Sequence, residues 1–258
     1  MKTNRELATR FDYSASFRAQ EPLLGYEVQQ RLKEVKLFVV GCGGLGFNIA
    51  LAAARSGIET IIQCDPQSVE DDNLNRILAG TRHLGRPKLR VVEELLCSFD
   101  RATADPGFSY TPLQLPVEHP EVEEYLDRAT HIISCPNSLA ARRFVLRYAV
   151  KAGKTLLNVG VSCMGRALMG EVSAYWPDQP GFACPGCISL RGEEQAQETP
   201  LFYPPLLVLS GLSLQLLTAG LAGREESRPN YVAFEASRYS VAALTVGADP
   251  SCPFCASP

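Results

Sequence analysis

The run VKLFVVGCGGLG at residues 35–46 constrains the fold of this chain more than any other stretch. Residues 37–40 are continuously apolar and end in glycines, which is typical of a buried parallel strand that feeds a tight turn. Residues 49–54 then continue as a short apolar helix, whose bare N–H groups at the start can approach a phosphate closely. The glycines of this turn are Gly41, Gly43, Gly44 and Gly46.

An acidic residue follows the next predicted strand. Residues 59–64 form a second apolar run, and Asp65 stands directly after it. In dinucleotide-binding folds an acid about 20 residues beyond the glycines hydrogen-bonds the ribose of the nucleotide. The G-x-G-x-x-G spacing is a weak signal by itself, and a chance glycine turn is the alternative. With a strand before it, a helix after it and an acid beyond, it predicts a nucleotide-binding unit of the Rossmann type.

Length and charge exclude several classes of protein. The 258 residues suffice for a full hydrophobic core, and a net charge of -3 gives no electrostatic reason to expect nucleic acid or an anionic membrane as a partner. The apolar stretch at 206–221 is short for a membrane span, so we expect it in the core or at a dimer interface. The first residues lack the apolar segment of a signal peptide. We therefore expect a cytoplasmic protein that binds neither nucleic acid nor membrane.

The nine cysteines fall into two groups. Five are scattered through contexts that predict burial, where a free cysteine behaves as a small hydrophobic residue. The other four form two C-x-x-C motifs, and two thiolates on one tight turn are suited to a tetrahedral Zn²⁺ ion. Such a site would hold the C-terminal tail against the body of the protein, whereas a redox role is the alternative. The proposed ligands are Cys184, Cys187, Cys252 and Cys255.

The remaining pattern alternates strands and helices. It predicts an α/β fold with a doubly wound, mostly parallel sheet of the Rossmann type, a C-terminal strand region and a structural zinc site. We expect one domain over 1–258, with an N-terminal arm and helix (1–34), a nucleotide-binding half (35–160) and a half for partner and zinc (161–258). The expected helices lie at 21–35, 88–96, 122–128, 140–152 and 206–221, and the further strands at 108–116, 131–135, 155–161, 168–176 and 231–246.

Polar residues after the predicted strand ends complete a candidate site. Asn73, Arg76 and Lys88 follow Asp65 along the chain, and Arg and Lys supply the positive charge that several phosphates need. Each of them taken singly is typical of a solvated surface. Asn137 lies in the loop after the strand at 131–135, where ligands of parallel sheets collect.

This ordered set of motifs resembles the ThiF/MoeB/HesA superfamily, relatives of the ubiquitin-activating enzymes, over roughly residues 10–255. The resemblance rests on GCGGLG at 41–46, Asp65, the N-L-x-R run that ends at Arg76, the G-x-P-K run that ends at Lys88, and the CPGC and CPFC motifs. Rossmann enzymes that use NAD share the glycines but need neither the Asn, Arg and Lys set nor the cysteine motifs.

The resemblance implies adenylation that depends on ATP and Mg²⁺. The substrate would be the C-terminal carboxylate of a small ubiquitin-like or sulfur-carrier protein, typically ending in Gly-Gly, or of a peptide. By the family's motifs, the four glycines would surround ATP and Asp65 would hold its ribose. Asn73, Arg76 and Lys88 would act on the phosphates, and Asn137 would occupy the position that binds Mg²⁺. The family also suggests a homodimer.

The chain departs from the family at three places. An R-[FY]-x-R segment usually supplies a second arginine across the dimer interface, but here residue 13 is Tyr, and Arg10 or Arg18 would have to substitute. Asn137 replaces an Asp that binds Mg²⁺, which removes a negative charge. The loop at 190–205 has no cysteine, which disfavours a thioester relay and leaves Cys135 and Cys163 as candidates only by elimination.

These departures leave two hypotheses. The first is an active adenylyltransferase. The second is a non-catalytic or half-catalytic relative that binds a ubiquitin-like partner or pairs with an active subunit.

Overall fold

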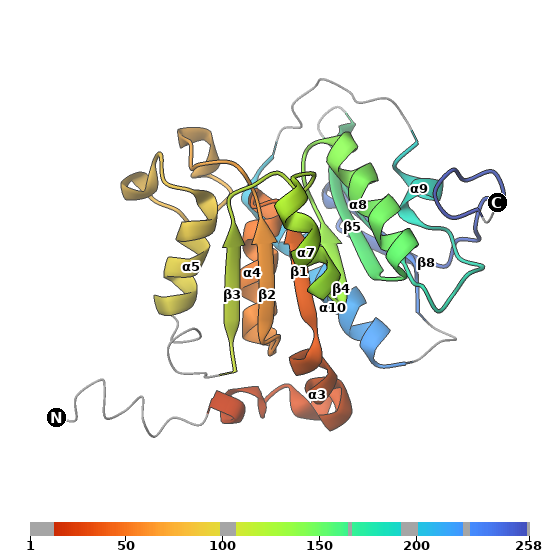
Figure 1. Ribbon diagram of the computed structural model, residues 1–258, viewed down its shortest axis with the longest axis horizontal. Helices are drawn as coiled ribbons and strands as arrows, with labels where there is room; N and C mark the ends of the chain where they lie inside the picture. Colours follow the sequence, from red (N-terminus) through yellow and green to blue (C-terminus); the bar gives the residue numbers. More distant parts are fainter. Residues whose placement is uncertain (1–12, 99–106, 165–166, 192–200, 224–227, 257–258) are drawn as a thin grey trace.

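An eight-stranded sheet forms the centre of the protein (Figure 1), with the strand order β3-β2-β1-β4-β5-β6-β7-β8. The computed structural model describes residues 13–98, 107–164, 167–191, 201–223 and 228–256. The strands are β1 (Lys36–Val40), β2 (Thr60–Cys64), β3 (Ser109–Leu113), β4 (His131–Ser134), β5 (Thr155–Met164), β6 (Ala167–Tyr175), β7 (Tyr231–Glu235) and β8 (Ser240–Leu244).

The first five strands run parallel to one another, whereas the last three join the sheet through antiparallel pairs. β1 pairs with β2 on one side and with β4 on the other, and β5 continues the parallel part. From β5 onward each strand pairs antiparallel with the next. Strand order reverses between β1 and β4, and in open α/β sheets ligands bind at the carboxyl ends of the strands at such a point. The predicted mostly parallel Rossmann-type sheet with a C-terminal strand region is confirmed.

Helices cover both faces of the sheet (Figure 1). α4 and α5 lie on one face with α10, whereas α7 and α8 lie on the other. The helices of the described residues are α2 (Glu21–Leu24), α3 (Tyr26–Glu34), α4 (Gly44–Ser56), α5 (Lys88–Ser98), α7 (Pro120–Arg128), α8 (Leu139–Ala152), α9 (Pro185–Ile188) and α10 (Tyr203–Leu221), and short 3₁₀ turns are η1 (Tyr13–Phe17), η2 (Asp71–Asn73), η3 (Thr81–His83) and η5 (Ala236–Arg238).

The helix expected at 21–35 is two helices. α2 ends at Leu24, and the chain changes direction at Gly25, which has φ +84°, before α3 begins. The apolar spacing that predicted one helix survives the break, because Val28 and Leu32 of α3 are buried. The other predicted elements are present, with ends that differ by a few residues. The expected strand region at 231–246 is the hairpin of β7 and β8.

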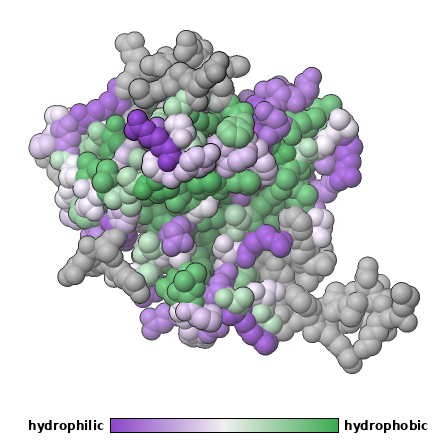
Figure 2. All heavy atoms as spheres, turned by 180° about the vertical axis from the view of Figure 1, so that it is seen from behind, coloured by the Kyte–Doolittle hydropathy of each residue, from purple (hydrophilic) through white to green (hydrophobic). Residues whose placement is uncertain are grey.

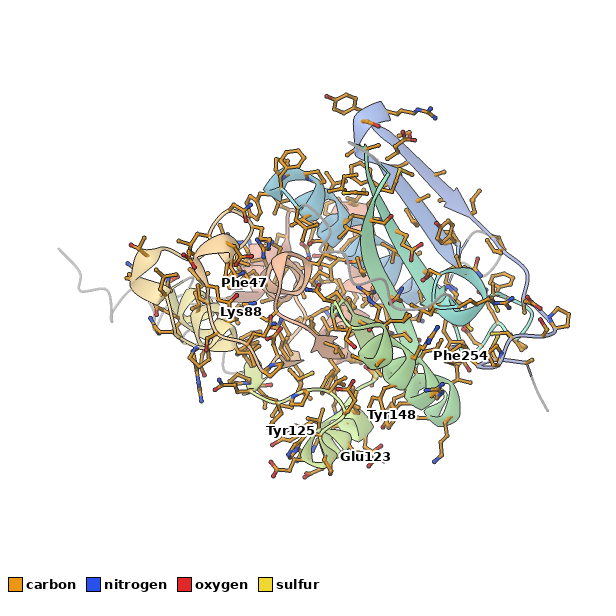
Figure 3. All side chains as sticks on the ribbon, turned by 90° about the horizontal axis from the view of Figure 1, so that it is seen from above. Phe47, Lys88, Glu123, Tyr125, Tyr148 and Phe254 are labelled. Atoms are coloured by element: carbon orange, nitrogen blue, oxygen red, sulfur yellow. The ribbon has the colours of Figure 1, made fainter. Side chains whose placement is uncertain are left out.

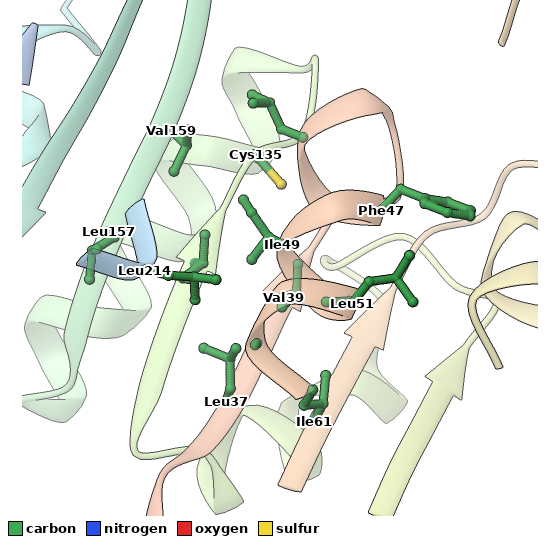
Figure 4. Close-up of a cluster of buried hydrophobic side chains, with 14 of the residues drawn as sticks. Leu37, Val39, Phe47, Ile49, Leu51, Ile61, Cys135, Leu157, Val159 and Leu214 are labelled. Atoms are coloured by element: carbon green, nitrogen blue, oxygen red, sulfur yellow. The ribbon is translucent and has the colours of Figure 1, made fainter. Parts of the chain in front are cut away.

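Two hydrophobic clusters lie on the two faces of the sheet. The larger one joins β1 and β2 to α4, α5 and α10, and Figure 4 shows Leu37, Val39 and Ile61 of the strands beside Ile49 of α4. The smaller one packs β1 and β4 against α7 and α8 and extends to the cysteine motifs. β1 is covered on both faces, and its residues 37–40 are accordingly a continuous apolar run.

α10 is the helix of the described residues that is long and apolar enough to span a membrane by length and composition alone. It packs on α4 and β6, and core helices of soluble proteins meet the same criterion. Leu207 and Val208 are nevertheless 45% and 42% exposed, and Phe202 precedes them with 57%. Figure 2 views the molecule from behind, and it shows hydrophobic side chains across the face on which α4 and α10 lie.

Asn230 connects the C-terminal hairpin to the segment that leads into the first cysteine motif. The side chain is fully buried, and its Nδ2 donates to the carbonyl oxygens of Ala183 (2.8 Å) and Val246 (2.9 Å). Its Oδ1 accepts from the N–H of Val246 at 2.7 Å. One amide thereby satisfies three backbone groups and positions the loop that carries Cys184.

Candidate nucleotide site and cysteine cluster

The glycine turn between β1 and α4 is closed by contacts that exclude side chains. Gly41 has φ +96°, and a Cβ there would lie 3.1 Å from the carbonyl oxygen of Cys135. At Gly46 a Cβ would lie 2.1 Å from the carbonyl oxygen of Gly41. The absence of both side chains lets α4 begin directly at the carboxyl end of β1. Its first N–H groups, which have no intrahelical acceptors, consequently stand at the edge of the sheet where ligands collect.

Asp65 bonds to the backbone of this turn. Its Oδ2 accepts from the N–H of Cys42 at 2.6 Å, and its Oδ1 accepts from the N–H of Gln67 at 2.7 Å. The carboxylate is buried. It thereby fixes the turn to the end of β2, a role that the sequence pattern did not indicate. Its contact with a ribose stays a prediction.

Lys88 lies close to the same turn. Its side chain is buried, and Nζ donates to Oε1 of Gln67 at 2.8 Å. Burial raises the pKa of the Cys42 thiol well above its usual range, Asp65 raises it further, and the charge of Lys88 acts in the opposite direction. In Figure 3, Lys88 appears beside Phe47 of α4, in agreement with the packing of α5 on α4. Gln67 therefore joins the segments that carry Asp65 and Lys88.

Arg76 packs its backbone against the turn while its guanidinium is held by a neighbour. Its carbonyl oxygen and its Cβ are 3.3 and 3.4 Å from the point where a Cβ would stand on Gly44. Nη2 forms an ion pair of 2.7 Å with Asp72. The hydrogen bond from Arg76, with a smaller effect of its charge, lowers the pKa of Asp72. The guanidinium would exchange this exposed carboxylate for a phosphate if it acts on a nucleotide.

The side chain of Asn73 orders the loop that carries Arg76. Asn73 is buried, its Oδ1 accepts from the N–H of Glu70 at 3.2 Å, and its Nδ2 donates to Asp72 at 2.6 Å. The observed contacts are thus within the loop itself. A contact between Asn73 and a phosphate stays a prediction.

Asn137 follows backbone that touches the glycine turn. The carbonyl oxygen of Cys135 and the nitrogen of Pro136 lie 3.1 and 3.3 Å from the position that a Cβ of Gly41 would take. Asn137, the residue after Pro136, is exposed.

Two arginines were expected to replace the second arginine of the family, which is absent at residue 13. Of these, Arg18 is exposed, and Arg10 lies outside the described residues.

The two cysteines left as relay candidates differ in environment. Cys135 is buried, its Sγ donates to the carbonyl of Val40 at 3.1 Å, and burial raises its pKa to about 12. A thiol in that state is a poor nucleophile at neutral pH. Cys163 is half-buried near the end of β5. Of the loop at 190–205, in which relatives would carry a relay cysteine, residues 192–200 lie outside the described residues.

The four motif cysteines converge on one point. Their Sγ atoms all lie within 4.8 Å of one another. The separations are 3.9 Å for Cys184–Cys187, 3.8 Å for Cys184–Cys252 and 3.5 Å for Cys187–Cys255. Tetrahedral thiolates at about 2.3 Å from zinc stand about 3.8 Å apart, so this cluster can hold such an ion. Burial raises the pKa of the Cys184 thiol above its usual range. A single four-sulfur group fits a metal better than two separate redox pairs.

The sequence as a whole matches known proteins of one family. The model of the ThiF family matches residues 16–254, so the chain belongs to the ThiF family.

Curated relatives include the sulfur carrier protein ThiS adenylyltransferase of Escherichia coli, which is 28% identical over 58% of this chain and 61% of its own length. The adenylyltransferase and sulfurtransferase MOCS3 of Xenopus laevis is 29% identical over 63% of this chain and 35% of its own length. The chain thus spans less than two thirds of the length of these relatives.

Solved structures share the fold. E. coli MccB, in a structure with MccA-N7isoASN, superimposes with a TM-score of 0.75 over 96% of this chain and 76% of that one, at 19% identity. PaaA gives a TM-score of 0.72 over 96% of this chain and 78% of that one, at 16% identity.

Substitution of Gly46 by alanine tests the close approach in the turn. Because a Cβ would meet the Gly41 carbonyl, Gly46→Ala is expected to lower the free energy of unfolding by about 3 kcal/mol in urea titrations. Gly43→Ala is the matched control, since nothing lies within 4 Å of a Cβ at that position. Equal stability of the two variants would show that the turn adapts.

Removal of one thiol tests the cysteine cluster. Cys252→Ser is expected to abolish stoichiometric zinc, measured by elemental mass spectrometry, and to cost at least about 2 kcal/mol of stability, because metal binding energy is folding energy. Cys97 of α5 is exposed, so its predicted burial is wrong, and Cys97→Ser should change neither. One metal ion per chain in Cys252→Ser would contradict the four-ligand assignment.

Proposed function

We propose that this chain is an ATP-dependent adenylyltransferase. It activates the C-terminal carboxylate of a small ubiquitin-like or sulfur-carrier protein, or of a peptide, as an acyl-adenylate. The observation that carries this proposal is that Asp65 and the backbone of Arg76 contact one glycine turn, to which Lys88 is linked through Gln67 and Asp65. The names of the curated relatives, which are adenylyltransferases, support it further.

In the proposed reaction the substrate carboxylate attacks the α-phosphorus of ATP. A carboxylate oxygen forms a bond to phosphorus, the bond to the bridging oxygen of the β-phosphate breaks, and pyrophosphate leaves with the electron pair. Such a step is accelerated by positioning and by charges fixed where negative charge develops. The N–H groups at the start of α4 and the side chains of Arg76 and Lys88 would supply both, and Asp65 would orient the ribose.

The magnesium of the nucleotide would find one neutral protein ligand. Mg²⁺ at nucleotide sites is usually held by one or two carboxylates together with the phosphates. Asn137 offers an amide oxygen in the corresponding loop, and Asp65 is already bonded to two backbone N–H groups. The triphosphate itself would therefore hold most of the ion, with Asn137 as its protein contact.

The C-terminal half would bind the partner and hold zinc. We infer that the four-cysteine cluster takes Zn²⁺, which would fasten the last residues to α9 and thereby to the sheet. The exposed apolar side chains of α10 suit a subunit interface, which supports a homodimer.

Asn137 and Tyr13 favour a second candidate function. With an amide at the metal position and no arginine at residue 13, the chain would bind a ubiquitin-like partner without full catalysis or pair with an active subunit. Exchange of labelled pyrophosphate into ATP separates the two functions. No exchange with any carrier protein or peptide, together with measurable carrier binding, would favour this second function over the first.

Loss of the phosphate-binding cations should abolish exchange. Lys88→Ala and Arg76→Ala are each expected to lower the rate of ATP–pyrophosphate exchange by about 100-fold or more, because each removes a charge that acts in the transition state. The matched control is Arg90→Ala on the same helix, whose exposed side chain pairs with Glu93. A rate in Lys88→Ala close to that of the control would contradict the assigned role.

Restoring a carboxylate at position 137 should strengthen metal binding. Asn137→Asp is expected to tighten Mg²⁺–ATP binding by about tenfold in calorimetric titrations, because a negative ligand attracts a hard cation. Affinity for ATP in the presence of EDTA should not rise. An unchanged affinity for Mg²⁺–ATP would mean that Asn137 does not occupy the metal position.

A further inference from the structure

One polar side chain lies inside the apolar core directly beneath the glycine turn. Gln63 belongs to β2, where Ile61, two residues earlier, contributes to the larger hydrophobic cluster on the same face. The side chain of Gln63 is fully buried. Burial of an amide is unfavourable unless its donors and acceptor are paired, so the partners of Gln63 explain its presence.

The amide of Gln63 spans the turn from its first glycine to its last. Nε2 donates to the carbonyl oxygen of Gly41 at 2.9 Å and to that of Gly46 at 3.1 Å. The Gly41 carbonyl is the group that lies against Gly46, where it leaves no room for a Cβ. Gln63 therefore supplies the donor for a carbonyl that points into the protein, and it ties the end of β1 to the first turn of α4.

Tyr110 of β3 orients this amide. Its hydroxyl donates to Oε1 of Gln63 at 2.9 Å, which leaves Nε2 to face the two glycine carbonyls. Burial raises the pKa of Tyr110 well above its usual range, so the phenol keeps its proton. The same hydroxyl lies 3.5 Å from the carbonyl oxygen of Leu89, the residue after Lys88. Tyr110 and Gln63 thus link the start of α5 to both ends of the glycine turn.

We propose that Gln63 is a positioning residue for nucleotide binding, which holds the glycine turn in the conformation that presents the N–H groups of α4 to the phosphates, with Tyr110 fixing the orientation of the amide. The inference rests on the proposed function, because it assigns the turn to a nucleotide. Gln63 makes no contact with the nucleotide itself and acts through the backbone of Gly41 and Gly46. A preformed turn avoids the ordering cost that a loose one would impose on binding.

The test compares Gln63→Met with wild type by two readouts. Methionine keeps the length of the side chain and removes the amide. Hydrogen exchange without nucleotide should show faster exchange of the amides at 41–47 than in wild type, with other core amides little changed. Calorimetry should show about tenfold weaker ATP binding at a temperature where both proteins are folded. Tyr110→Phe, which removes only the orienting donor, should give a smaller change of the same kind.

Leu126→Ala on α7 controls for lost stability, because it creates a cavity in the cluster on the other face of the sheet. It should lower the melting temperature and leave ATP affinity within about twofold of wild type. ATP affinity of Gln63→Met within that range, or unaltered exchange at 41–47, would overturn the inference. A wild-type protein that binds no ATP would instead refute the proposed function, and faster exchange in Gln63→Met would then show a structural role only.

Discussion

The contact between Gly46 and the carbonyl oxygen of Gly41 is the constraint on which the candidate site depends. Since a Cβ at Gly46 would lie 2.1 Å from that oxygen, the helix can begin against the strand end only with glycine at this position. As a consequence, the first N–H groups of α4, which lack intrahelical acceptors, stand where the strand order reverses between β1 and β4. Two side chains at the end of β2 and the backbone after β4 then secure the turn. Asp65 bonds to Cys42, Gln63 bonds to both glycine carbonyls, and the backbone of Cys135 lies against Gly41.

The C-terminal half is joined to this site through continuous structure. β5 extends the parallel sheet and pairs with β6 over most of its length, so the two halves share one set of strands. α10 closes the same face as α4, with Leu206 against Gly44 of the turn. Asn230 and the cysteine cluster fasten the tail to this framework. If the cluster holds zinc, as proposed, loss of the ion should loosen the tail first, because the glycine turn has its own hydrogen bonds at the end of β2.

The sequence predicted the fold well because its signals were local. Each signal depends on only a few neighbouring residues: the spacing of the glycines, the apolar runs of the parallel strands, and the two C-x-x-C motifs. The sheet and the cysteine cluster are present as expected. The break at Gly25 was missed because the apolar spacing continues across it. Gln67 and Tyr110 were missed because their partners come from other segments. Only Gln63 carried a visible signal, as an amide in the otherwise apolar run IIQC. The contacts of Asp65 with the backbone have no sequence signature, since an acid after a strand fits either a loop or a ligand.

A crystal structure with a non-hydrolysable ATP analogue tests the central claim most directly. The account predicts the α-phosphate within hydrogen-bonding distance of the N–H groups at the start of α4, with Lys88 in contact with the phosphates and Arg76 released from Asp72. An empty crevice under saturating analogue, or phosphates bound away from Lys88 and Arg76, would contradict it. Selective binding of a nicotinamide dinucleotide at the same turn would contradict it as well.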